Sequence, residues 1–258
     1  MKPIVLIPSY NTGPELLLRT LEETLVATTF PIVLVIDGST DGSSDAALSL
    51  AETNTRLSVV VKLRNEGKGS AVRTGLQRAA SSGFTHALIM DADGQHPADR
   101  INDFLAAAER NPEAMILGQP VFDASVPLER LHGRKLSVWV VRAEIMGTEI
   151  GDPLYGFRVY PIEPLLKVMG PGGRSDRYDF DPEVAVRLFW KGTPAVKIPA
   201  RVNYLNKESG GVSHFHYVRD NIRFVWLHTR LLLQAPFRCL TLWIRMGSRR
   251  KRQSSVAA

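Results

Sequence analysis

Short runs rich in valine, isoleucine and leucine alternate with longer segments of helical hydrophobic period through the N-terminal part of the chain. Runs of this kind are typical of parallel strands buried on both faces, and successive parallel strands need a crossover helix between them. The predicted strands are Ile4–Ile7, Ile32–Ile36, Leu57–Val61 and Ala87–Met90. The helices that follow them begin near Pro14, Ser44, Ser70 and Pro97. This alternation predicts an α/β fold on a doubly wound, mostly parallel sheet.

A polar segment follows each of these predicted strands. The segments are Pro8–Gly13, Asp37–Ser43, Arg64–Ser70 and Asp91–His96. The carboxyl ends of parallel strands lie at one edge of a sheet, and doubly wound sheets bind their ligands there. We therefore expect the functional residues in these segments.

The second half of the chain has a less regular pattern. We expect a strand, a helix, a loop, a strand and a helix, at Ala114–Leu117, Leu128–Ile145, Asp152–Gly156, Phe157–Tyr160 and Pro182–Trp190. Neither an internal repeat nor a Pro/Ser-rich linker separates the halves, so the sequence predicts one domain over residues 1–212. The single cysteine, Cys239, excludes an internal disulfide and a thiolate metal cluster.

Two carboxylates, Asp91 and Asp93, directly follow the fourth apolar run. Carboxylates two residues apart on a loop can bind one hard divalent cation and leave its other positions open for phosphate oxygens. Gln95 could add a further oxygen ligand. The alternative is that Asp93 caps the following helix, which is a common use of aspartate.

A glycine-rich stretch, Asn65–Ser70, leads into the third predicted helix. Its backbone amides and Lys68 could face an anion, because a helix N-terminus and a lysine both favour negative charge. A simple turn is the alternative. The glycine spacing fits neither the dinucleotide-binding fingerprint nor the P-loop, which disfavours the enzymes that use them. Asp37 could accept hydrogen bonds from a base or a ribose, or form a turn with Gly38.

Motifs in a fixed order carry a resemblance to a known family. They are P-S-Y-N from Pro8, I-D-G-S-T-D-G-S from Ile36, N-E-G-K-G-S-A-V-R-T-G from Asn65, L-I-M-D-A-D-G-Q-H-P from Leu88 and D-P-L-Y-G-F-R from Asp152. Over about residues 1–212 the chain resembles family 2 glycosyltransferases with the GT-A fold. Within that family it looks most like the polyprenyl-phosphate (dolichol-phosphate type) sugar transferases.

The resemblance implies roles on the donor side. Pro8, Tyr10 and Asp37 would line the nucleoside pocket of a nucleotide-sugar donor. The residues that would hold Mg2+ or Mn2+ on the donor diphosphate are Asp91, Asp93 and Gln95. The cation would stabilise the departing nucleoside diphosphate in a single displacement that inverts the anomeric centre. Thr12 and Ile36 replace acidic residues of the family pattern.

On the acceptor side, Asp152 and Glu183 match acidic positions of the family. A hydroxyl acceptor needs a carboxylate base, for which Asp152 is the candidate, whereas a phosphate acceptor is already an anionic nucleophile. The alternative for Asp152 is a turn before Pro153. Where the family has G-S-R and G-x-S-K, this chain has Gly118-Gln119-Pro120 and Gly211-Val212-Ser213-His214, so basic residues that could pair with an acceptor phosphate are missing. The candidates to substitute for them are Arg130, Arg134 and Arg158.

The C-terminal segment is both apolar and basic. Residues 201–258 hold 11 basic and two acidic residues, so the basic excess of a chain of net charge +6 lies there. From Tyr217 to Met246 the arginines fall within a sector of roughly 100° on a helix. The longest uncharged run, Leu231–Phe237, is far short of the roughly 20 apolar residues that span a bilayer.

These features predict a C-terminal attachment to an anionic membrane surface. We expect residues 213–246 to form amphipathic helices at the membrane interface, with Pro236 kinking or splitting them, and residues 247–258 to form a basic, disordered tail. A helix packed on the catalytic domain or in a dimer interface is the alternative. No nucleic-acid recognition motif accompanies the basic residues.

The sequence therefore predicts a metal-dependent, inverting glycosyltransferase that moves a sugar from a nucleotide-diphosphate sugar to a lipid or lipid-linked acceptor. Two alternatives remain: a nucleotidylyltransferase, which would release pyrophosphate, and a non-catalytic protein that binds sugar nucleotides or lipid. The first apolar run is too short for a signal peptide. We expect a cytoplasmic protein, peripheral on the cytoplasmic face of the inner or plasma membrane.

Overall fold

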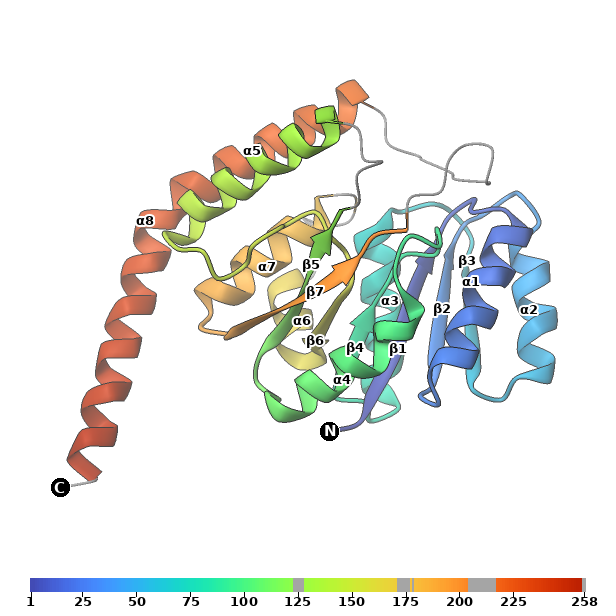
Figure 1. Ribbon diagram of the computed structural model, residues 1–258, viewed down its shortest axis with the longest axis horizontal. Coiled ribbons are helices and arrows are strands. Elements are labelled where there is room, and N and C mark those ends of the chain that lie inside the picture. The colour runs from blue at the N-terminus through green and yellow to red at the C-terminus, as the bar shows by residue number, and fades with distance from the viewer. Residues whose placement is uncertain (123–127, 171–176, 178, 204–216, 257–258) are drawn as a thin grey trace.

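The computed structural model describes residues 1–122, 128–170, 177, 179–203 and 217–256, without the side chains of 128–132, 217–221 and 244–256 (Figure 1). Its N-terminal half consists of βα units, as predicted. They comprise β1 (Pro3–Ser9), α1 (Pro14–Ala27), β2 (Ile32–Asp37), α2 (Ser43–Thr53), β3 (Leu57–Lys62), α3 (Lys68–Ser81), β4 (His86–Ile89), the 3₁₀ turn η1 (Ala98–Arg100) and α4 (Ile101–Arg110).

The second half has two elements that the sequence did not reveal, α6 and β7. The order is β5 (Met115–Val121), α5 (Leu128–Ile145), β6 (Arg158–Pro161), α6 (Ile162–Met169), α7 (Phe180–Trp190), β7 (Ala195–Arg201) and α8 (Tyr217–Val256). With 8 residues, α6 is too short to show a helical period. The edge strand β7 is mostly half-exposed and contains a proline, so it lacks the apolar run of a buried strand.

The seven strands of the described residues form one sheet, in the order β3-β2-β1-β4-β6-β5-β7. Of these seven strands, only β6 runs antiparallel to its neighbours, with Arg158 paired to Ile89 at the end of β4. The start of β6 therefore lies at the same edge as the carboxyl ends of the parallel strands. This reversal brings the loop that contains Asp152 to the edge that carries Asp91.

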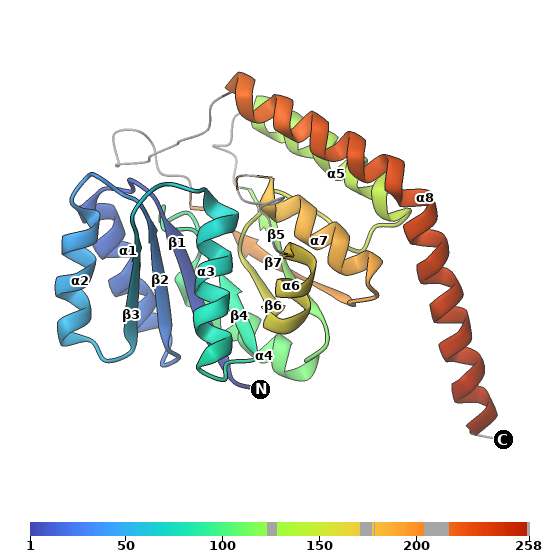
Figure 2. The same cartoon turned by 180° about the vertical axis from the view of Figure 1, so that it is seen from behind.

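Helices cover both faces of the sheet, and each face has its own hydrophobic core. Alternate residues of β1 point to opposite faces: Val5 and Ile7 join one core, and Ile4 and Leu6 join the other. Figure 1 looks at the face covered by α1, α2 and α4, and Figure 2 shows α3, α6 and α7 on the other. The predicted doubly wound architecture is confirmed.

The helix α8 contains Pro236 and is not split by it, and Figures 1 and 2 show a bend along its length. It differs from the prediction in two respects, the first of which is that it continues to Val256 through most of the predicted disordered tail. Arginine, lysine and glutamine are good helix formers, and no later proline interrupts them. Its residues Leu227 and Leu231 belong to the core that also contains Phe180. The described part of α8 therefore packs into the same core as the catalytic domain, so this core contains residues from both sides of the boundary predicted near residue 212.

Two buried carboxylates hold α8 on the domain. Glu144 of α5 is hydrogen-bonded to His228 at 2.8 Å, and Glu183 of α7 pairs with Arg230 at 2.6 Å. Both glutamates are fully buried. Figures 1 and 2 show α8 running beside α5 before it bends away from the domain. No helix in the described part of the chain is both long and apolar enough to cross a membrane.

Candidate active site

The loops after β1 and β2 are joined by hydrogen bonds. The amide of Asn11 donates to Oγ of Ser39 at 3.0 Å, and Oδ1 of Asn11 accepts from the amide of Thr40 at 2.8 Å. The amide of Gly13 donates to Asp41 at 2.7 Å. These bonds fix the two loops against each other at the carboxyl edge of the sheet.

Asp37 joins the second loop to the glycine-rich stretch. Its Oδ1 accepts from Lys62 at 2.6 Å, and its Oδ2 accepts from the amides of Glu66 at 3.0 Å and Gly67 at 2.6 Å. The side chain is buried, so these bonds make Asp37 a support for the loop. The predicted contact of Asp37 with a nucleoside stays a prediction. In that contact the nucleoside would donate to a carboxylate oxygen that already accepts a hydrogen bond from Lys62 or from a backbone amide.

The other two residues predicted to line the nucleoside pocket flank the end of β1. Pro8 is buried within β1, next to Val35 of β2. Tyr10 is half-buried in the loop that follows. Their position at the carboxyl edge suits the predicted role, which stays a prediction.

Lys68, the first residue of α3, lies between two carboxylates. Its Nζ is 2.6 Å from Oδ1 of Asp91 and 2.7 Å from Oδ2 of Asp181, in the first turn of α7. Burial alone would lower the pKa of Lys68, but the charges of Asp181 and Asp91 outweigh burial and raise it. The lysine is therefore a permanent cation inside the site. Asp181 was not among the predicted site residues, because only the folded chain brings α7 to this loop.

Asp93 lies close enough to Asp91 for the two negative charges to repel each other. Its Oδ1 accepts from the amide of Gln95 at 3.1 Å. Burial raises the pKa of Asp93 to about 6, and the negative charge of Asp91 adds to the rise. A divalent cation bound by both carboxylates would relieve this repulsion, and oxygen is the ligand type that Mg2+ and Mn2+ prefer.

The residues present therefore fit a divalent ion that takes part of its ligands from the protein and part from the bound donor. Within the described part of the chain, no group of three or more His, Cys, Asp or Glu side chains could hold a metal by itself. Asp91 and Asp93 would supply carboxylate oxygens, and Gln95 the amide oxygen that we predicted. The remaining positions would be filled by water and by diphosphate oxygens.

His96 fixes the turn that carries these carboxylates. Its Nδ1 accepts from the amide of Asp91 at 2.9 Å, and its ring lies edge-on to Tyr155 at 5.1 Å. Burial lowers the pKa of His96 to about 4, so the ring is neutral at neutral pH. Gly156 lies against the carboxylate of Asp91, where a Cβ on Gly156 would be 3.1 Å from Oδ2 of Asp91. The sequence motifs contain both residues but do not reveal this contact.

Arg158 does not lie where an acceptor could reach it. It is fully buried, and its guanidinium donates to the carbonyls of Tyr155, Asp152, Pro153 and Asp181 and to the hydroxyl of Tyr160. These bonds use its five N–H groups. The prediction that Arg158 substitutes for a phosphate-binding residue is therefore wrong. Its role is to hold the loop before β6 against α7.

Asp152 is paired with Arg134 of α5. Its Oδ2 accepts from Arg134 at 2.8 Å, and its Oδ1 accepts from the amide of Leu154 at 2.8 Å. Its own amide donates to Oε1 of Gln119 in β5 at 3.0 Å, so Gln119 positions this loop. The structure thus brings Asp152 and Arg134 together, and their place on the acceptor side stays a prediction.

The two remaining acceptor-side predictions have different outcomes. Glu183 is fully buried, and its Oε1 accepts from Arg187 and Arg230 at 2.7 and 2.6 Å. Glu183 therefore joins α7 to α8 and does not face an acceptor, contrary to the prediction. The side chain of Arg130 lies outside the described residues.

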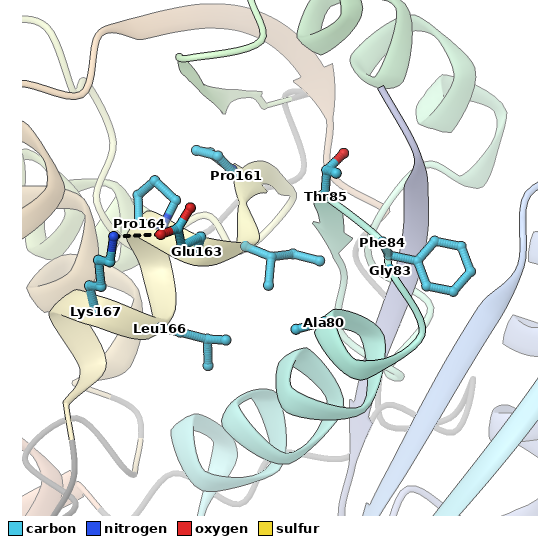
Figure 3. Close-up of a pocket in the computed structure, with 10 residues that line it drawn as sticks. Ala80, Gly83, Phe84, Thr85, Pro161, Glu163, Pro164, Leu166 and Lys167 are labelled. Atoms are coloured by element: carbon cyan, nitrogen blue, oxygen red, sulfur yellow. Dashed lines mark hydrogen bonds and ion pairs between the residues drawn. The ribbon is translucent and has the colours of Figure 1, made fainter.

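A pocket at the opposite edge of the sheet contains none of the predicted site residues. Figure 3 shows it between the end of α3, the turn before β4 and the start of α6, with Ala80, Thr85 and Leu166 among its lining residues. Its volume is about 650 Å3, and it is open to solvent. Because Thr85 precedes β4 and Asp91 follows it, the pocket and the carboxylates lie at opposite ends of that strand.

Comparison with known proteins identifies the family. The model of the glycosyl transferase family 2 matches residues 4–162, more than half of the chain. This chain belongs to glycosyl transferase family 2. The matched residues include the four polar loops, Asp152 and Arg158, whereas α7 and α8 lie beyond the match. A family 2 glycosyltransferase transfers sugars, so the nucleotidylyltransferase alternative is set aside.

Two curated relatives match most of this glycosyltransferase. One is the polyprenol monophosphomannose synthase of Mycolicibacterium smegmatis, 28% identical over 214 residues, 81% of this chain and 79% of the relative. The other is the undecaprenyl-phosphate mannosyltransferase of Micrococcus luteus, 25% identical over 81% of this chain and 86% of the relative.

Among solved structures, a mannosyltransferase from Pyrobaculum calidifontis in complex with GDP-Man and Mn2+ has a TM-score of 0.61 and 20% identity, covering 94% of this chain and 69% of that one. Glucosyl-3-phosphoglycerate synthase from Mycobacterium tuberculosis, in complex with phosphoglyceric acid, also has a TM-score of 0.61, at 16% identity over 92% of this chain and 80% of that one. At these identities the similarity shows the shared GT-A fold, which confirms the predicted fold class.

Proposed function

We propose that this family 2 glycosyltransferase moves a sugar from a nucleoside diphosphate sugar to a polyprenyl phosphate, with Mg2+ or Mn2+, on the cytoplasmic face of a membrane. One relative is named a polyprenol monophosphomannose synthase and the other an undecaprenyl-phosphate mannosyltransferase, and both resemble the chain over most of its length, which supports this acceptor class. A structural neighbour that holds a nucleotide sugar and Mn2+ supports the donor and the ion.

The pairing of Asp152 with Arg134 is the observation that favours a phosphate acceptor. A carboxylate whose two oxygens already accept from Arg134 and from the amide of Leu154 is poorly placed to take a proton from a hydroxyl. Arg134 is partly exposed and can offer further N–H groups to a phosphate, because a guanidinium carries five donors. The acceptor side thus offers a cation to bind an anionic nucleophile.

The chemistry of this transfer needs little from the protein beyond orientation and charge. An acceptor phosphate oxygen bonds to the anomeric carbon while the bond from that carbon to the donor diphosphate breaks, and no proton has to move. Arg134 would orient the acceptor, and Asp91 and Asp93 would hold the donor side. A bound divalent cation supplies positive charge for the diphosphate as it leaves.

Replacing Arg134 with methionine tests the acceptor class. We expect kcat/KM for the lipid phosphate to fall by about 10- to 100-fold, because a hydrogen bond to a charged group contributes about 1.5–3 kcal/mol. Donor hydrolysis should change little. The matched control is Lys135→Met, which removes an exposed cation from the next position of α5.

Asp152→Asn separates the two acceptor classes. With a phosphate acceptor we expect a loss of less than about tenfold, whereas removing a general base costs about 10²–10⁴-fold. A loss in the larger range, with donor affinity unchanged, would mean that the acceptor is a hydroxyl. Equal losses of donor affinity and rate would mean that Asp152 only maintains the structure.

The outer face of α8 supports attachment to the membrane. Its exposed large apolar residues fall within a sector of about 140°, opposite the buried face. They are Ile222, Val225, Trp226, Leu232, Leu233, Phe237, Leu240 and Trp243. Arg230, from the predicted basic stripe, instead pairs with Glu183 and stabilises the packing of α8 on the domain. Insertion therefore depends on the apolar face, and the basic C-terminal residues add attraction to an anionic cytoplasmic leaflet.

Replacing Trp226 and Phe237 together with serine should release the protein from vesicles. Both side chains are exposed, at 68% and 76%. Burying each in lipid contributes about 1.5–3 kcal/mol, so we expect vesicle partitioning to fall by about 100-fold or more. High salt alone should release only part of the wild-type protein, because it screens charge and not apolar burial. Flotation on neutral and anionic liposomes measures both effects.

The control for this experiment is Val26→Ser, which removes an exposed apolar residue from α1. Truncating the C-terminal segment is not a suitable test, because Leu227 and Leu231 belong to the core and Glu144 and Glu183 would lose their α8 partners. If the full-length protein binds neither kind of liposome, α8 is not a membrane anchor.

A further inference from the structure

The ammonium group of Lys68 forms an ion pair with Asp91, one of the two carboxylates that would bind the divalent ion. Its Nζ lies 2.6 Å from Oδ1 of Asp91, and the lysine side chain is only 14% exposed. A cation at this distance competes with a metal for the same oxygen and repels it electrostatically. For Asp91 to bind a metal with this oxygen, Lys68 has to move away from it.

Asp181 provides a place for the displaced ammonium group. Its Oδ2 already lies 2.7 Å from Nζ of Lys68. Its Oδ1 is buried and has no hydrogen-bond partner among the described residues. A buried carboxylate oxygen without a partner is costly, so it favours any movement that brings a donor to it.

The backbone around Asp181 is held in place independently of Lys68. Its carbonyl accepts from Nη1 of Arg158 at 2.7 Å, and Arg158 is fixed by the loop before β6. Two residues further along α7, Glu183 pairs with Arg187 and Arg230. Asp181 is therefore a fixed carboxylate, toward which the flexible lysine side chain can move.

We propose that Lys68 is a built-in cation that neutralises Asp91 when no metal is bound, and that Asp181 takes up its ammonium group when a divalent ion binds. Asp181 is then a positioning residue that acts through Lys68 and sets the affinity of the carboxylate pair for the ion. This inference rests on the proposed metal-dependent function, which it deepens. In the metal-bound protein, Lys68 stays beside the diphosphate site as a second positive charge.

Mn2+ binding to the nucleotide-free, full-length protein tests this exchange, with titration calorimetry as the readout. Asp181→Asn should weaken Mn2+ binding by about 10- to 100-fold, the usual cost of losing a residue that supports a metal ligand. Lys68→Met should tighten Mn2+ binding by about tenfold, because it removes the competing cation.

The double variant Lys68→Met/Asp181→Asn distinguishes exchange from a simple change of charge. If Asp181 acts through Lys68, Asp181→Asn has little effect once Lys68 is absent, and the double variant binds Mn2+ like Lys68→Met. If Asp181 acts only as a nearby negative charge, the same loss persists in both backgrounds, which overturns the proposal. A thermal unfolding scan in EDTA confirms that each variant is folded before Mn2+ is added.

The outcomes separate this inference from the proposed function. If the wild-type protein binds Mn2+ and both single variants leave the Kd unchanged, the exchange is wrong while metal-dependent transfer stands. If the variants shift the Kd as expected but no sugar reaches a polyprenyl phosphate, the acceptor is wrong and the exchange stands. A wild-type protein that binds no Mn2+ overturns the exchange and the metal dependence together.

Discussion

Asp93→Ala is expected to abolish sugar transfer. The carboxylate would hold the cation where negative charge develops as the nucleoside diphosphate leaves, so its loss raises the barrier and not only KM. Metal-assisted stabilisation of a leaving group contributes several kcal/mol, and each 1.36 kcal/mol is a factor of ten in rate. We expect a loss of at least about 10³-fold, with donor binding that is weaker and no longer responds to Mn2+.

The thermal stability of the variant distinguishes loss of a metal ligand from unfolding. Since the pKa of Asp93 is raised to about 6 in the folded protein, the ionised carboxylate destabilises the metal-free fold. This destabilisation grows as the pH rises from the ordinary aspartate value through 6. Asp93→Ala should therefore unfold at the same or a higher temperature than the wild type at pH 7, without metal.

Single-turnover rates and Mn2+-dependent donor binding are the measurements. Asp103→Ala is the matched control, because Asp103 is an exposed carboxylate on α4, near the metal loop in sequence. An Asp93→Ala protein with the wild-type rate and the wild-type response to Mn2+ would contradict the assignment.

Arg158→Met is expected to cause the largest loss of stability. The side chain is fully buried, and its removal leaves the buried carbonyls of Asp152, Pro153 and Asp181 without their donor. Each orphaned group costs about 1–3 kcal/mol, so we expect the free energy of unfolding to fall by about 3–5 kcal/mol. For a chain of this size that corresponds to a Tm lower by about 10 °C.

Thermal and urea unfolding of metal-free protein measure this effect. Arg110→Met, at an exposed position of α4, is the control and should change the Tm by no more than about 1–2 °C. Arg158→Lys should recover only part of the loss, because an ammonium cannot make the five bonds of a guanidinium. An Arg158→Met protein of normal Tm that has lost affinity for the lipid phosphate would restore the acceptor role predicted from the sequence.

The sequence by itself determined the βα order, the sheet edge where the site lies and the family. These features depend on local patterns: the period of apolar residues, and polar motifs such as the one that holds Asp91 and Asp93 directly after a strand. A strand buried on both faces shows its apolar run whatever surrounds it. The loop after such a strand then lies at the carboxyl edge through the parallel pairing alone.

Only the tertiary structure decided which polar residues of the site already form hydrogen bonds or ion pairs with other parts of the protein. Asp37 bonds to amides about 30 residues away, and Lys68 bonds to Asp181 across 113 residues. Arg158 and Glu183 match family motifs, but their burial removes them from the acceptor side. A motif specifies the residue type at a position, whereas exposure and partners depend on contacts between segments far apart in the chain.

The same distinction applies to α8. Its sequence shows an apolar helix with arginines, which suits both a membrane surface and a packed helix. The position of Glu144 and Glu183 on other helices decides that His228 and Arg230 face the domain, and this leaves Trp226 and Phe237 on the outside. Helical period defines the faces of a helix, but the partners that those faces meet are set by the rest of the fold.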